Sequence, residues 1–77
     1  MKVGMDDPGR IWVHEEVYRQ ATAFDELVAG KGFVFAEVIE QCFRDIEDDE
    51  NQMRWKDIGD YLKLRKQAGD GAVVTLN

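Results

Sequence analysis

The apolar positions of this 77-residue chain recur at helical spacing through most of its length. Between residues 11 and 29, side chains three and four positions apart share one side of a helix; they are Val13, Val17, Ala21, Phe24 and Val28. Gly30 and Gly32 follow, and glycine suits the left-handed conformation that ends a helix. We therefore expect a first helix over about 11–29. The segment 10–14 also fits the second strand of a small hairpin, but we favour the helix.

A second amphipathic segment gives the clearest pattern in the chain. Its apolar positions form a continuous stripe, with charged and amide side chains outside it; the stripe consists of Phe35, Val38, Ile39, Cys42, Phe43 and Ile46. We expect a helix over about 33–48 whose stripe faces the core, with the Cys42 thiol buried.

The acidic run from Asp45 to Glu50 interrupts this pattern, because the stripe would next meet charged residues. Carboxylates are favourable at the positive start of a helix, and Asp49 followed by Gln52 fits a capping box. A third helix over about 50–68 is expected, with one side formed by Trp55, Ile58, Tyr61, Leu62 and Arg65.

The segments outside these helices are short. Residues 1–9 are predicted to be extended or frayed, and 70–77 to be extended, so that Ala72 to Leu76 can pair with Val3 to Met5. The sequence predicts a single domain, 1–77, of mainly α class: a compact three-helix domain with short extended terminal segments that can pair. The alternative is an α+β fold with a small terminal ribbon.

Charge and composition limit where the protein can act and what it can bind. The formal net charge is −6. Residues 1–51 carry 13 acidic and 5 basic side chains, and residues 52–77 carry 3 acidic and 5 basic ones. The chain has one cysteine and no signal-peptide pattern, and its apolar runs are far shorter than the roughly 20 residues that cross a bilayer. We expect a cytoplasmic protein that does not enter membranes.

Candidate chemical sites are weak. Asp45, Glu47, Asp49 and Asn51 match the first four ligand positions of a calcium loop. The sixth position of the loop, however, is Glu50 instead of glycine, and its twelfth is Lys56 instead of glutamate. His14 is the only histidine, and the chain has no serine. We therefore predict no catalytic, metal-binding or cofactor-binding residues and no enzymatic activity.

Two binding functions remain. Aromatic residues are numerous for three helices around one small core, and Trp, Tyr and Arg dominate binding energy at interfaces. The leading expectation is a non-enzymatic protein-interaction module, a small regulator, adaptor or inhibitor that forms a homodimer. Its candidate contact residues are Trp12, Tyr18, Trp55, Tyr61, Arg54 and Arg65. In the opposing interpretation, Trp12 packs on the third helix and Trp55 on the first, which leaves no aromatic surface exposed.

The alternative function is a small nucleic-acid-binding regulator. It would use the basic third helix to contact phosphates. Its candidate residues are Arg54, Lys56, Lys63, Arg65 and Lys66. Asp57 and Asp60 interrupt this set, and the cations are spread around the helix, so the protein-interaction function is preferred.

Overall fold

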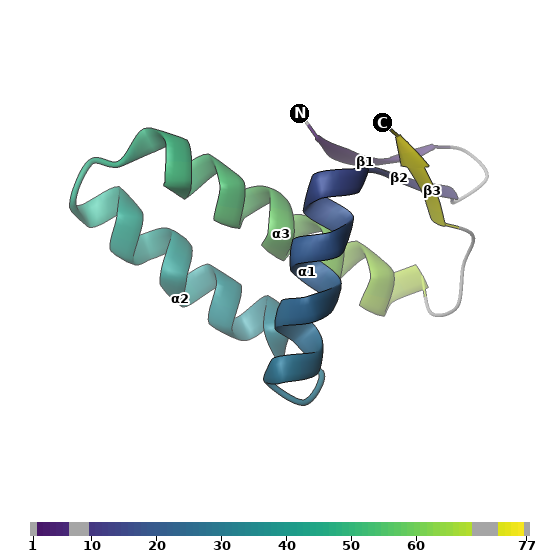
Figure 1. Ribbon diagram of the computed structural model, residues 1–77, viewed down its shortest axis with the longest axis horizontal. Helices are drawn as coiled ribbons and strands as arrows, with labels where there is room; N and C mark the ends of the chain where they lie inside the picture. The colour runs from purple at the N-terminus through teal and green to yellow at the C-terminus, as the bar shows by residue number, and fades with distance from the viewer. Residues whose placement is uncertain (1, 7–9, 69–72, 77) are drawn as a thin grey trace.

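The computed structural model describes residues 2–6, 10–68 and 73–76, and consists of three helices and a small three-stranded sheet (Figure 1). In chain order the elements are β1 (Val3–Asp6), β2 (Arg10–His14), α1 (Glu15–Leu27), α2 (Gly32–Asp45), α3 (Asp49–Ala68) and β3 (Val73–Leu76). The predicted class, mainly α with extended terminal segments, is confirmed. Helices α2 and α3 form an antiparallel hairpin that α1 crosses, and the turn end of the hairpin extends beyond α1.

The sheet has the order β1-β2-β3, so β2 is the central strand. It pairs antiparallel with β1, where Val3 lies opposite Val13, and parallel with β3, where Ile11 lies opposite Val73. The expectation that the two terminal segments pair with each other is therefore wrong, because each pairs with β2. Segment 10–14 is a strand, and the first helix begins at residue 15 rather than about residue 11.

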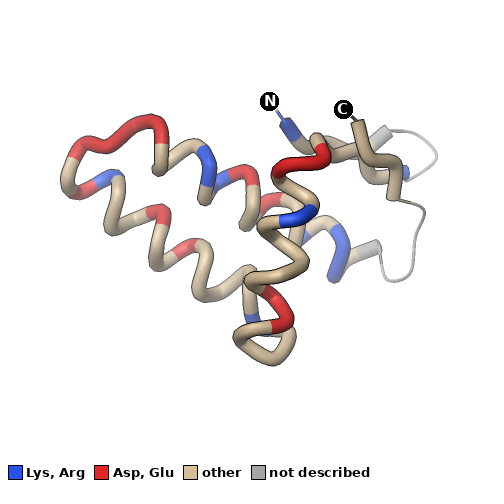
Figure 2. Tube along the Cα trace, viewed as in Figure 1, with Lys and Arg blue, Asp and Glu red and all other residues tan. Residues whose placement is uncertain are grey.

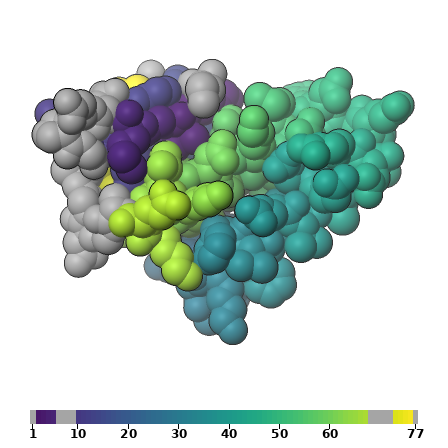
Figure 3. Space-filling view, turned by 180° about the vertical axis from the view of Figure 1, so that it is seen from behind, coloured from purple at the N-terminus to yellow at the C-terminus, as the bar shows by residue number. Residues whose placement is uncertain are grey.

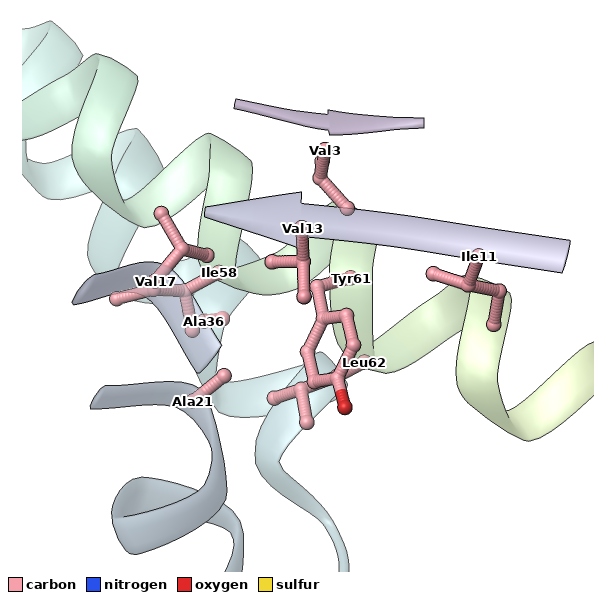
Figure 4. Packing of buried hydrophobic residues seen from close by; sticks show 9 residues of the cluster. All are labelled: Val3, Ile11, Val13, Val17, Ala21, Ala36, Ile58, Tyr61 and Leu62. Carbon is pink, nitrogen blue, oxygen red and sulfur yellow. The ribbon is translucent and has the colours of Figure 1, made fainter. Parts of the chain in front are cut away.

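The core lies where the sheet meets the three helices. Ile11 and Val13 are fully buried on the side of β2 that faces α3 (Figure 4). Tyr61 is also fully buried, and its hydroxyl accepts a hydrogen bond of 2.9 Å from Nη1 of Arg65. The other buried apolar residues are Val3, Val17, Ala21, Ala36, Ile58 and Leu62. Strand alternation in β2 and helical spacing in α1 and α3 thus converge on one small cluster.

The turn between α1 and α2 depends on two glycines. Gly30 has φ +82° and donates its amide to the Asp25 carbonyl at 2.8 Å, as expected for a glycine that closes a helix. Gly32 instead begins α2 and donates its amide to Oδ1 of Asp25 at 2.9 Å. A Cβ at Gly32 would lie 2.7 Å from that oxygen and 2.8 Å from Cδ1 of Leu62. The start of α2 is therefore held tightly against α1 and α3.

The turn between α2 and α3 contains the predicted helix cap, displaced by one residue. Asp48, not Asp49, precedes α3, and its Oδ1 accepts the amide of Asn51 at 3.3 Å. Nδ2 of Asn51 donates a second hydrogen bond, of 2.8 Å, to the other carboxylate oxygen of Asp48. Gln52, the expected partner in the cap, donates instead to Oε2 of Glu40 at 2.9 Å and joins α3 to α2.

Candidate interaction surfaces

Most of the apolar stripe predicted for the core side of α2 is exposed to solvent. Phe35 is 46% exposed, Val38 59% and Ile46 69%, and Cys42 is exposed as well. We name these four residues the α2 stripe. Their spacings of three, four and four place them along one side of the helix. The predictions that this stripe is core and that the Cys42 thiol is buried are wrong.

The reason lies in which side of α2 meets its neighbours. The buried residues of α2 are Gly32 and Ala36, both small. Small residues at a contact bring helix axes closer together, and a Cβ built on Gly59 of α3 would lie 3.4 Å from the Cβ of Ala36. From the stripe as predicted, only Ile39 and Phe43 are half-buried. Figure 3 views the molecule from behind, where α2 and α3 lie side by side.

The two ends of α2 differ in charge (Figure 2). At its C-terminal end lies the acidic corner, which comprises Asp45, Glu47, Asp48, Asp49 and Glu50. At its N-terminal end Lys31 is exposed, and the first turn of the helix contains no acidic residue. At the same end the Asp25 carboxylate accepts the Gly32 amide at 2.9 Å, which offsets the helix dipole and part of the charge of Lys31. The α2 stripe, itself uncharged, therefore runs from an end of mixed charge to a strongly negative one.

A second apolar surface lies on the outer face of the sheet. Alternation along β2 turns Trp12 away from Ile11 and Val13, and its cross-strand neighbours are Gly4 on β1 and Val74 on β3. The indole covers Gly4 so closely that a side chain there would overlap the ring. A shallow hollow of about 460 Å³ is lined by Arg10, Trp12, Val74 and Leu76, which we name the sheet patch.

The other aromatic candidates for protein binding pack within the domain. Tyr18 and Tyr61 meet edge to face with ring centroids 5.9 Å apart. Trp55 meets Phe24 of α1 in the same way at 4.9 Å. The packing of Trp55 on the first helix thus follows the opposing interpretation, whereas Trp12 lies on the sheet and not on the third helix. Among the predicted contact residues, Trp12 alone belongs to either apolar surface.

The basic residues of α3 do not share a face. Eleven residues, three turns, separate Arg54 from Arg65, which places both on one side of the helix. Seven residues separate Lys56 from Lys63, and this pair lies on roughly the opposite side. Lys66 places its ammonium 4.5 Å from the ring centroid of Phe33. No continuous phosphate-binding row follows from this arrangement of the five predicted cations.

A pocket of about 240 Å³ lies between α1, α3 and Lys2, the residue before β1. Lys2 forms an ion pair with Glu16, and its hydrogen bond and charge lower the pKa of that carboxyl. Asp57 is buried in the pocket wall, and burial raises its pKa although Lys2 opposes the shift. The pocket also includes Glu50 and Arg54. Charges of both signs therefore alternate around it, which favours internal pairing over capture of a charged ligand.

Side chains that could bind a metal ion are not brought together in the part of the chain that the structure describes. Within residues 2–6, 10–68 and 73–76, no three His, Cys, Asp or Glu side chains come together as a metal site would need. The exposed Cys42 makes no side-chain hydrogen bond within those same ranges, whereas an activated thiol needs a base within reach. Exposure of a thiol alone does not define a site.

No family model, curated protein or solved structure matches this chain. Among the helices that the structure describes, none combines the length and apolar character needed to cross a membrane.

Proposed function

We propose that this protein is a non-enzymatic protein-interaction module that acts as a small regulator, adaptor or inhibitor. The observation that supports this is the α2 stripe, in which Phe35, Val38, Cys42 and Ile46 are exposed along one side of a helix. Contiguous exposed apolar surface of this kind is typical of association sites.

The small size of the domain strengthens the argument. A chain of about this length buries only roughly 60% of the surface that its unfolded form exposes, so its core is small. Phe35, Val38 and Ile46 nevertheless point outward, while the fully buried residues of α2 are only Gly32 and Ala36. A partner that covers Phe35, Val38 and Ile46 would supply the apolar burial that the isolated domain lacks.

Charge supports a protein partner over nucleic acid. The acidic corner lies at one end of the α2 stripe, and phosphates would be repelled there. The five cations of α3, at positions 54, 56, 63, 65 and 66, do not align into a row that could compensate. The sheet patch around Trp12 provides a second apolar surface, so an adaptor that contacts two proteins is compatible with this fold.

The test is affinity capture from a lysate of the source cells with three forms of the tagged protein. Val38→Glu introduces a charge into the α2 stripe, and Ala23→Glu introduces the same charge at an exposed position of α1. We expect wild type and Ala23→Glu to retain the same discrete protein and Val38→Glu to lose it. Circular dichroism verifies that all three forms are folded.

Each capture is divided into nuclease-treated and untreated halves. The proposal requires that the partner survive nuclease treatment. A partner that disappears with nuclease, or that Val38→Glu retains as well as wild type does, would contradict it. In the first case the cations of α3 would become the candidate site.

A further inference from the structure

We infer that the occupant of the α2 stripe is the α2 stripe of a second copy of this chain, packed antiparallel to the first. This inference rests on the proposed function and specifies the partner at the same surface. It follows from the shape of the stripe, from the charges at the two ends of α2 and from the area available.

The shape of the stripe suits a helix partner. From Phe35 to Ile46 the helix rises about 16 Å, and the four side chains point to one side at spacings of three, four and four. An apolar seam with such spacing is the pattern by which two helices pack along their length. In a two-fold symmetric pair the N-terminal half of one stripe contacts the C-terminal half of the other, so Phe35 of each copy lies near Ile46 of its partner.

The charges select the orientation. In an antiparallel pair centred between residues 40 and 41, Lys31 of one copy lies at the end of the pair where α2 of the other copy, Gly32–Asp45, reaches the acidic corner. The exposed Lys31 then faces the acidic corner twice, once at each end of the pair. A parallel pair would instead place the two acidic corners side by side, with ten carboxylates close together. Opposite charges thus favour the antiparallel pair, and like charges oppose the parallel one.

The area of the contact between the two copies determines how tightly they associate. The contact is one face of a 14-residue helix, about 21 Å long. Stable dimers bury at least about 1,200 Å² in total, and smaller interfaces belong to the weak, transient class. We therefore expect a dimer that dissociates on dilution into the micromolar range. Such a dimer leaves the stripe accessible to a heterologous partner at low concentration.

The experiment measures the mass of the purified protein by sedimentation equilibrium between about 10 µM and about 1 mM. Wild type and Ala23→Glu should shift from monomer to dimer across this range, and Val38→Glu should remain monomeric. Lys31→Glu should weaken the dimer about fivefold, since two symmetric ion-pair contacts become repulsive. Wild-type protein that stays monomeric at about 1 mM would overturn the inference without reference to any variant.

Spin labels test the orientation. Because Cys42 lies inside the proposed contact, the label is placed instead at position 31, at the edge of the pair. In the Cys42→Ala, Lys31→Cys form, antiparallel packing predicts about 30 Å between labels. A value of about 10 Å there would mean parallel packing and refute the inference.

The outcomes separate the two proposals. If wild type remains monomeric while the captured partner still depends on Val38, the second-copy inference fails and the proposed function stands. If the protein dimerises through another face, Val38→Glu and Ala23→Glu will both dimerise like wild type, and the inference fails. If neither dimer nor stripe-dependent partner is found, both proposals fail.

Discussion

Two valines on different helices provide a direct measure of how the helices pack. Val17 of α1 is 2% exposed and Val38 of α2 is 59% exposed. The same substitution, Val→Ala, removes two methyl groups at each position and changes helix propensity equally. The difference between the two effects therefore reports burial alone.

The magnitudes follow from transfer energies. Two fully buried methyl groups contribute about 1.6 kcal/mol, and the cavity left behind adds about 1 kcal/mol. The higher helix propensity of alanine offsets about 0.5 kcal/mol of this loss. Val17→Ala should thus lower the free energy of unfolding by ~2 kcal/mol. At Val38 about two fifths of the transfer energy is lost and no cavity forms, so the net effect should be close to zero.

The assay is urea unfolding followed by circular dichroism, at about 5 µM so that the monomer predominates. The midpoint should fall clearly for Val17→Ala and stay within error for Val38→Ala, with the same denaturant slope for all three proteins. Equal losses at the two positions, or a larger loss at Val38, would mean that the stripe is core as its periodicity suggests. The argument for an exposed interaction surface would then be wrong.

Three further predictions use matched pairs or a matched pH series. Gly32→Ala should lower the free energy of unfolding by about 1–3 kcal/mol, because the added methyl group would overlap the carboxylate that accepts the Gly32 amide. Gly59→Ala should leave the free energy of unfolding unchanged or raise it by up to about 1 kcal/mol. Both are measured by urea unfolding, and equal effects would contradict the helix contacts. Asp48→Ala should lower the free energy of unfolding by about 1 kcal/mol through loss of the helix cap, and Asp49→Ala by less than about 0.5 kcal/mol. If thermal unfolding gave the reverse ranking, Asp49 and not Asp48 would be the cap. Burial raises the pKa of Asp57 above its ordinary value of 3.8. The protonated carboxyl is therefore favoured in the folded state, and the free energy of unfolding that it contributes is complete below about pH 3.8 and is lost as the pH rises through the folded-state pKa. Asp57→Asn should therefore gain stability over wild type at pH 7 and gain less at about pH 3.5, and a gain that does not vary with pH in urea titrations would count against the burial of this charge.

The helices could be predicted because their apolar positions recur at helical spacing, and the ends of α2 and α3 were placed within a few residues. The start of α1 could not. Val13 fits the strand alternation with Ile11 and also the helical spacing with Val17, so local pattern leaves the two structures equal. Pairing decides between them, since β2 is flanked on both sides by strands. One of these strands comes from the other end of the chain, which no local pattern reveals.

The exposure of the α2 stripe was not predicted, for a different reason. Periodicity identifies the apolar side of α2 but does not say whether a neighbour covers it. The useful signal was the set of small residues, Gly32, Ala36 and Gly59, because close helix contact requires small side chains. Aromatic content was a poor guide, since Trp55 and Tyr61 pack inside the domain. In this chain the large exposed side chains of α2 are aliphatic as well as aromatic, as Val38 and Phe35 show.

The central position of β2 has a consequence for the order of folding. Ile11 and Val73 pair although about 60 residues separate them, and closing a loop of that length costs ~4 kcal/mol of chain entropy. The four residues of β3 are mostly exposed and bury little apolar surface in return. Helix contacts between near neighbours should therefore form first, with β3 the last strand to dock and the first to leave. Each departure opens one edge of β2, and an open edge is a template on which another chain can aggregate.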